Sequence, residues 1–506
     1  MESSRRVFLQ ALAASTAVAM VAGRSGAVAN PVPKLTTWTP PGGWGTFGKP
    51  RRILEIYLRG GASLWGTFLY NTNAGGAAGT GDATFNTSTI VPAPAPVTHA
   101  WHGGTIGNAA DPLFRQNGIV AGRALAKFMR VLRVRHDLPP HEAAIPYAAT
   151  GSTLGRPQMS GLGAAVYRRH IEAIAGVPVP GPRSLIFQTG NQTGDDNASR
   201  YLATYGLHGA QYRPPVIKVG DQTFYNALDR LTDKKTITDD VKRLFRGRYA
   251  DRMSAPTSVG TTEVRSLGWS SYKASLDTMV NDYAILYSLL TSQSGLLFPP
   301  AGDPALIAPT LDTSNLTRYS ITAALNLLVA HSNQLQHVAV VDGGVFDNYD
   351  THDLKGGIPA AQQHAGNLWN VCDTLADNMD AILDNGICVL IHSEFGRIGS
   401  GVLNGTGHYT DAYANIIISD LVKPGFSGDV DSTSFAPVAT YPGAHNVLAA
   451  LSPTDTHAAV AQLAGIQPWQ SDMFGADADL SALNDESVPN PTVLTLANSP
   501  WQQILT

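Results

Sequence analysis

The sequence predicts an α/β protein with a doubly wound, mostly parallel sheet that is covered by helices on both faces. Two continuous apolar runs, "HVAVV" from His337 and "CVLI" from Cys388, are typical of strands that are buried on both sides. The helical pattern of Ala360–Asn385 lies between them and completes a strand–helix–strand crossover. No linker or internal repeat divides the chain of 506 residues, and 43% hydrophobic residues suffice for a large core. We therefore expect a single α/β domain with long loop insertions.

The other elements follow from local patterns. Ile53–Leu58 reads as a buried strand that ends at Gly60-Gly61, and Val131–Val134 as another. Further strand and helix patterns are, in chain order, "HEAAIPYAATGS" (helix), "RPQMSGLGAAVYRRHIEAI" (helix), "RSLIFQT" (strand), "SYKASLDTMVNDYAILYSLL" (helix) and "DTSNLTRYSITAALNLLVAHS" (helix).

The N-terminal segment predicts export. Arg5 and Arg6 precede an alanine-rich apolar run, and the triplet Ala27–Ala29 offers a cleavage site. The paired arginines before Phe-Leu favour a twin-arginine signal over an ordinary secretory signal or an amphipathic start. Residues 1–29 are thus expected to be a signal that engages the twin-arginine translocase. Residues 30–506 would form a periplasmic or secreted domain without a membrane span.

Composition excludes several classes of function. The net charge is −4, and no basic stripe indicates nucleic-acid binding. Neither a CxxCH motif nor a glycine fingerprint after a strand indicates a redox cofactor. Cys372 and Cys388 lie in apolar surroundings, which favours two buried thiols over a disulfide.

Polar residues gather where strands are expected to end. In an open α/β sheet, ligands bind at the carboxyl ends of the strands. Four loops leave such ends: Arg59–Trp65, the turn after Val134, Asp342–Asp353 and Ser393–Gly407. We expect their side chains to converge although they are far apart in the sequence.

Two of these loops carry the strongest chemical signals. "VDGGVFDNYDTHD" holds Asp347, Asp350 and His352, which could bind a divalent cation or could simply cap a solvated turn. "SEFGR" holds Glu394 and Arg397. The carboxylate could bind metal or act as a base and the arginine could clamp an anion, or the two could form an ion pair that fixes the loop.

A family resemblance rests on five segments in order: "LRGGASLW", "RPQMSGLGAAV", "FDNYDTH", "SEFGR" and "GTGH". Together they resemble the exported bacterial family catalogued as domain of unknown function 1501, which is similar to the alkaline phosphatase and sulfatase superfamily. The resemblance implies an alkaline-phosphatase-like fold, usually two divalent metals, and a Ser, Thr or Cys nucleophile at a helix start. It also implies hydrolysis or transfer at a small anionic phosphate or sulfate ester.

The chain departs from that family at important positions. Ser63 and Gly407 stand where the family has aspartates, and the expected nucleophile position reads Asp137-Leu138-Pro139-Pro140. Ser160 is a substitute nucleophile, although an N-cap role is the preferred interpretation. The expected metal ligands are Asp347, Asp350, His352, Glu394 and His408, with Arg397 on the anion. His364 is an outer-shell prediction, whereas structural roles are expected for His141, His392 and His445.

Two functions stay open on the sequence. The chain is either a metal-dependent ester hydrolase with a partly degenerate site, or a non-catalytic exported protein that binds a ligand or assists another exported protein. Surviving histidines and the twin-arginine signal favour the first. The lost carboxylates and nucleophile favour the second.

Overall fold

The computed structural model describes about two fifths of the chain. The described residues are 51–62, 77–78, 97–99, 104–106, 125, 127–152, 159–173, 182–190, 193–206, 212–219, 315–332, 334–344, 348–352, 357–399, 406–422, 425–427, 429–431, 437–438 and 451–466. The predicted signal at 1–29 and the predicted helix at 271–290 lie outside them.

An eight-stranded sheet forms the centre of the described part, with the strand order β13-β5-β12-β9-β1-β8-β6-β7. Its strands are β1 (Arg52–Leu58), β5 (Met129–Val134), β6 (Ser184–Gln188), β7 (Val216–Lys218), β8 (His337–Asp342), β9 (Ile387–Ser393), β12 (Tyr413–Ile418) and β13 (Gly425–Ser427). Only β12 runs antiparallel to its neighbours among these eight. The prediction of a mostly parallel sheet is confirmed.

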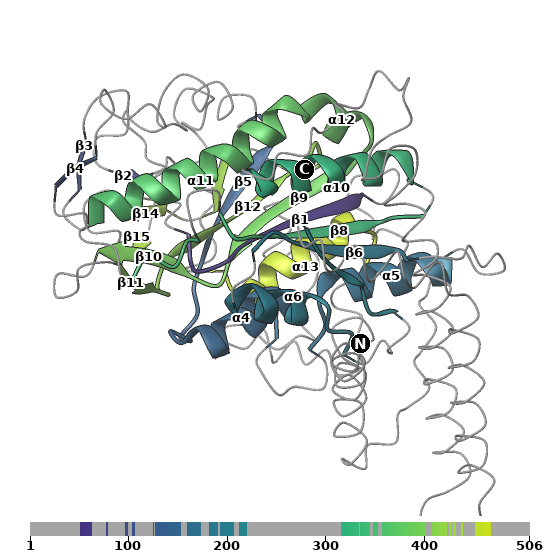
Figure 1. Cartoon of the computed structure of the whole chain (residues 1–506), viewed down its shortest axis with the longest axis horizontal. Coiled ribbons are helices and arrows are strands. Elements are labelled where there is room, and N and C mark those ends of the chain that lie inside the picture. The colour runs from purple at the N-terminus through teal and green to yellow at the C-terminus, as the bar shows by residue number, and fades with distance from the viewer. Residues whose placement is uncertain are drawn as a thin grey trace, which may run out of the picture.

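Helices cover both faces of this sheet (Figure 1). On one face lie α10 (Leu316–Ala330), α11 (Gly357–Asp377) and α12 (Met379–Asp384). On the other lie α4 (His141–Thr150), α5 (Leu162–Ala173), α6 (Thr193–Leu202) and α13 (Pro453–Leu463). The α/β fold class is therefore confirmed. One detail of the prediction is wrong: the single long helix expected before β9 is interrupted at Asn378, which separates α11 from α12. The side-chain amide of Asn378 donates a hydrogen bond to the Thr374 carbonyl.

Smaller sheets lie outside the main one. A hairpin pairs β10 (Gly396–Gly399) with β11 (Thr406–Tyr409), and it matters for the site described below. The other short strands are β2 (Ala77–Ala78), β3 (Val97–His99), β4 (Gly104–Ile106), β14 (Asp429–Asp431) and β15 (Pro437–Val438).

The two faces of β1 differ in chemistry, because alternate side chains of a strand point to opposite faces. Leu54, Ile56 and Leu58 belong to an apolar cluster with side chains of α10, α11 and α12. On the opposite face, Tyr57 packs with side chains of α4 and α6, while Glu55 is a fully buried carboxylate. The strand therefore has one purely apolar face and one that carries a buried charge.

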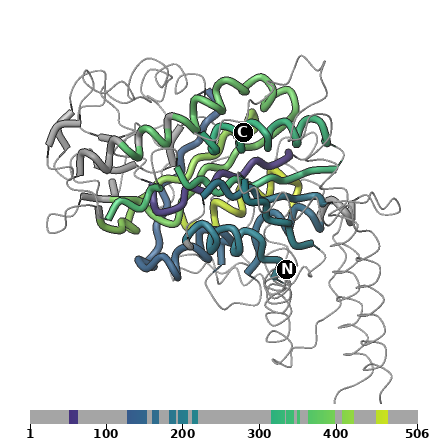
Figure 2. The backbone as a smooth tube through the Cα atoms, viewed as in Figure 1, coloured from purple at the N-terminus to yellow at the C-terminus, as the bar shows by residue number. Residues whose placement is uncertain are grey.

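Chain direction brings the predicted loops to one edge. Strands β1, β5, β8 and β9 run in the same sense and end at that edge, and antiparallel β12 begins there. The backbone path in Figure 2 shows how segments from distant parts of the chain meet at the sheet. The expectation that these loops converge is confirmed for the described residues.

No helix among the described residues is both long and apolar enough to cross a bilayer. Cys372 and Cys388 are buried and unpaired with each other, as predicted, and burial raises the pKa of both thiols.

Candidate metal centre

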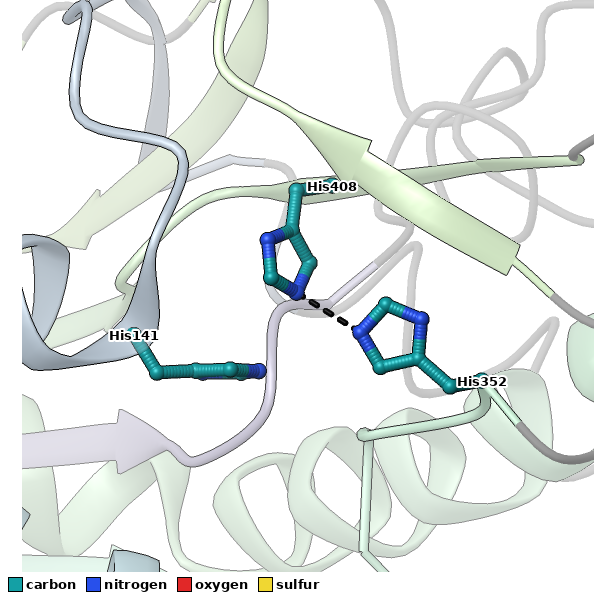
Figure 3. Close-up of side chains that lie close together, drawn as sticks. All are labelled: His141, His352 and His408. Carbon is teal, nitrogen blue, oxygen red and sulfur yellow. Dashed lines mark hydrogen bonds between the residues drawn. The ribbon is translucent and has the colours of Figure 1, made fainter.

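Three histidines from three separate segments point toward one another at the carboxyl edge of the sheet (Figure 3). His141 begins α4, His352 lies in the segment after β8, and His408 lies on β11. One ring nitrogen of each lies within 4.8 Å of the others, and the Nε2 atoms of His352 and His408 are 2.7 Å apart. All three side chains are partly buried. Three imidazoles that converge from separate elements form a ligand set suited to a divalent metal.

A buried carboxylate fixes the orientation of His141. Its Nδ1 lies 3.1 Å from Oε1 of Glu394, and the same oxygen accepts the Gly60 N–H at 2.7 Å. Burial opposes ionisation of Glu394, but the hydrogen bond and charge of His141, together with backbone hydrogen bonds that include the Gly60 N–H, lower the carboxyl pKa. An ionised carboxylate only accepts hydrogen bonds, so Nδ1 carries the proton and Nε2 keeps its lone pair. That lone pair faces Arg397 Nη2 at 3.3 Å, and a metal that took the place of this contact would complete the carboxylate–histidine–metal arrangement common to zinc sites.

A glycine turn holds the segment that carries His352. Gly60 follows β1 with φ +110, and a Cβ there would lie 2.4 Å from the Asp350 amide nitrogen. The Tyr349 N–H donates to the Arg59 carbonyl across the same contact. Only a residue without a side chain permits this approach and this backbone conformation. The turn after β1 thus sets the position of both Asp350 and His352.

The β10–β11 hairpin places His408. Arg397 on β10 and His408 on β11 are directly paired across it. The ring of Phe395 stacks on His408 with a centroid separation of 4.1 Å, and His141 lies 4.8 Å from the same ring. Burial and the nearby charge of Arg397 lower the pKa of His408 to about 4. His408 is consequently neutral near pH 7, the form that binds a metal.

Arg397 and Asp350 form an ion pair beside the imidazoles. The guanidinium donates to Oδ1 of Asp350 at 2.7 Å and to the Gly60 carbonyl, and its Nη1 lies 2.9 Å from Nε2 of His352. Burial lowers the pKa of Arg397 to about 10, so the group stays charged. Burial also opposes ionisation of Asp350, but Arg397 and then His141 outweigh it and lower its pKa. A cation and an anion therefore lie within reach of the same three imidazoles.

The contacts of His352 show that the residues fit a metal. Its Nε2 faces both His408 Nε2 at 2.7 Å and Arg397 Nη1 at 2.9 Å. One imidazole nitrogen offers either one proton or one lone pair, so it cannot satisfy both partners well. A cation between the rings would use the lone pairs of His352 and His408 together. Three imidazoles with a nearby carboxylate, Asp350 Oδ2 at 3.4 Å from His141 Nε2, match the donors that zinc favours.

The structure brings most of the predicted site residues together. Asp350, His352, Glu394, Arg397 and His408 share this edge of the sheet. Glu394, predicted as a ligand, holds His141 from behind through one of its oxygens. Asp347, also predicted as a ligand, lies outside the described residues.

Ser160, the suggested nucleophile, lies elsewhere. It forms a β-bridge with Tyr205, and its hydroxyl donates to the carbonyl of the next residue. The nearby Gly163 packs against Ser184 and His337, the first residues of β6 and β8. Those residues mark the amino-terminal edge of the sheet, opposite the histidine cluster. The structure therefore does not bring Ser160 to the other predicted residues.

Sequence reasoning assigned His141 a structural role, and this residue is the main omission. Two features of the sequence pointed to His141. The turn after Val134 was one of the expected ligand loops, and the family resemblance implied a nucleophile just before the helix that His141 begins. Asp342, from the same acidic loop, is instead fully buried and accepts bonds from Thr317, Gly344 and Tyr349. His364 Nε2 lies 2.9 Å from the carbonyl of Tyr349, in the segment that leads to His352.

Comparisons with known proteins add little to this geometry. No family model and no curated protein matches the chain. The crystal structure of the lipoteichoic acid synthase LtaP from Listeria monocytogenes is similar at 9% sequence identity and a TM-score of 0.35. That match covers 88% of this chain and 79% of LtaP. The geometry of the centre is thus the main guide to function.

Proposed function

We propose that this protein is an exported, metal-dependent hydrolase of small phosphate or sulfate esters with a single-metal centre. The observation that carries the proposal is the convergence of His141, His352 and His408, with Glu394 behind His141. The order of the sequence motifs, with its resemblance to the alkaline phosphatase and sulfatase superfamily, supports the substrate class. We further propose that residues 1–29 direct export through the twin-arginine translocase to the periplasm or beyond, and that 30–506 are one domain.

The residues of the centre would divide the work as follows. The three histidines would hold a divalent cation, with Asp350 as a fourth ligand or as a counter-charge to Arg397. A bound cation would polarise an ester oxygen and make a nearby water more acidic. Arg397 is charged and close to the imidazoles, so it would bind the anionic group of the ester.

The position of Ser160 bears on the type of reaction. A serine on the opposite edge of the sheet cannot attack an ester bound at the histidines. Direct attack by water fits a centre that has three imidazoles, a carboxylate and an arginine. We therefore propose hydrolysis without a covalent serine intermediate.

The test combines metal content with activity. We expect the full chain, purified without chelator, to carry about one chelator-removable divalent ion per chain and to hydrolyse p-nitrophenyl phosphate, its diester or the sulfate. His141→Ala, His352→Ala and His408→Ala should each lose that metal. The loss in affinity should exceed the roughly 10- to 100-fold cost of outer-shell changes. His331→Ala, a partly buried histidine outside the cluster, is the control and should bind normally. Absence of removable metal from folded protein would contradict the proposal.

A second function remains, and one observation favours it. Arg397 is already bonded to the Gly60 carbonyl and to Asp350, so the edge is well ordered without a substrate. A non-catalytic relative would use the same centre to bind an anionic ligand. Metal-loaded protein that binds phosphate or sulfate in calorimetry, yet turns over none of the three esters, would favour this function.

A further inference from the structure

A second histidine cluster lies inside the core, on the other face of the sheet from α10, α11 and α12. It consists of Glu55 on β1, His392 on β9 and His457 on α13. Each side chain is at most 1% exposed. One ligand atom of each lies within 4.8 Å of the others. The cluster is separate from the candidate metal centre, because it lies within the sheet and not at its carboxyl edge.

Strand register explains how these groups meet. His392 pairs with Tyr57, and His337 on β8 pairs with Ile53. In a parallel pair, partners point to the same face, and residues two apart on a strand share that face. Glu55, between Ile53 and Tyr57, therefore points to the same side as both histidines. His457 approaches from α13, with its ring perpendicular to that of His392 at 5.6 Å.

Two atoms of this cluster have only each other as a close polar contact. Glu55 Oε1 and His392 Nε2 face each other at 2.9 Å as a buried ion pair in imperfect hydrogen-bond geometry, and neither has a further hydrogen-bond partner. Fully buried polar atoms are nearly always bonded, because leaving one unpaired costs about 1–3 kcal/mol. A cation held by both atoms would replace this imperfect contact with two ligand bonds, one to a lone pair of each atom.

The remaining atoms of the cluster are held in place from behind. His457 Nε2 lies 2.7 Å from the Ala148 carbonyl, which can only accept, so Nε2 carries the proton and Nδ1 keeps a lone pair. The second oxygen of Glu55, Oε2, forms a hydrogen bond with His337 Nε2 at 2.9 Å. His337 Nδ1 in turn forms a hydrogen bond with the Ser184 hydroxyl at 2.7 Å. Outer partners of this kind orient the ligands in protein metal sites.

We propose that Glu55, His392 and His457 form a second, structural metal site that takes a divalent cation of the zinc class. Two imidazoles and a carboxylate are ligands that zinc favours. The site would tie the central strands β1 and β9 to α13. Because every ligand is buried, the ion would be taken up before folding is complete and released only slowly.

Metal analysis in a variant without the edge centre tests this site. In the full-length His352→Ala/His408→Ala protein, expressed with zinc and dialysed for days against a chelator, we expect about one zinc per chain to remain. X-ray absorption should show only nitrogen and oxygen ligands, at roughly 2.0–2.2 Å. If this protein keeps the circular dichroism of the parent but holds no zinc, or if sulfur ligands appear, the site does not exist.

Changes to the cluster give a second readout. His457→Ala should lose the chelator-resistant zinc, whereas Thr456→Val, at the adjacent buried position of α13, should keep it. Retention of the zinc by folded His457→Ala protein would overturn the assignment. If His457→Ala does not fold, the zinc content and absorption spectrum of the double variant decide the question alone. Neither measurement depends on hydrolysis, so failure of the proposed function leaves this test intact.

Discussion

Glu394 Oε1 lies 3.1 Å from His141 Nδ1 and accepts the Gly60 N–H at 2.7 Å. One carboxylate oxygen therefore joins the end of β9, the start of α4 and the turn after β1. This contact selects the His141 tautomer that leaves Nε2 available to a cation. The chemistry of the centre thus depends on a residue that need not touch the metal.

Removing the charge of Glu394 should weaken metal binding without removing a ligand atom of the three histidines. For Glu394→Gln we expect zinc affinity to fall about 10- to 100-fold, because an amide no longer fixes the His141 tautomer. Competition with a chromophoric chelator measures the affinity. Glu142→Gln, an exposed neighbour in the first turn of α4, is the matched control and should be unchanged. Equal affinities for both variants would show that Glu394 has no such role.

The turn at Gly60 should tolerate no side chain. In Gly60→Ala, the added carbon would meet the Asp350 backbone at 2.4 Å, in a conformation that alanine rarely adopts. We expect a loss in unfolding free energy of at least about 1–3 kcal/mol, together with weaker metal binding. Denaturant unfolding and metal titration measure the two effects.

Gly386→Ala controls for backbone strain at a distant site. Gly386 also has positive φ, but its added carbon would meet only the end of the Arg51 side chain. We expect about 1–2 kcal/mol of destabilisation with normal metal binding. Normal metal binding in folded Gly60→Ala protein would refute the role given to the turn.

His364 should make stability depend on pH. Burial, then the charge of Arg397, lowers its pKa from 6.5 to about 3. Between about pH 3 and 6.5 the unfolded chain therefore binds a proton at His364 that the folded chain does not bind. The free energy of unfolding consequently falls as the pH falls through this range. His364→Gln should reduce the slope of unfolding free energy against pH by up to about 1.4 kcal/mol per unit between pH 4 and 6. Denaturant titrations of both proteins give the slopes, and identical slopes would contradict the prediction.

The two thiols should be inert in the folded protein. Cys372 and Cys388 are buried, and burial raises the pKa of each. Since the thiolate is the reactive form, we expect no reaction with an aromatic disulfide reagent under native conditions. Unfolding without reductant should release both thiols per chain. A count below two after unfolding would reveal a disulfide that the structure does not contain.

Much of the fold could be predicted from the sequence, because the patterns that identify strands and helices are local. Continuous apolar runs identified β8 and β9, and the helical period between them identified most of α11. The sequence did not predict the break at Asn378. The side chain of Asn378 bonds to the carbonyl of Thr374, four residues earlier, and such a residue does not interrupt the helical pattern of apolar positions. The sequence could not predict the strand order. β1 ends at Leu58 and β8 begins only at His337, yet β1 lies between β8 and β9 in the sheet.

For the site, the sequence determined which loops bear ligand-type residues, and it named five of the side chains that meet at this edge. Only the tertiary structure decided how they act together. It brought His141 in from α4, put Glu394 behind it, and left Ser160 at the far edge of the sheet. The reason is physical: residue type and spacing report local preferences, whereas a metal centre depends on distances of a few ångströms between segments. Those distances are set by strand direction, register and close contacts such as Gly60 against Asp350.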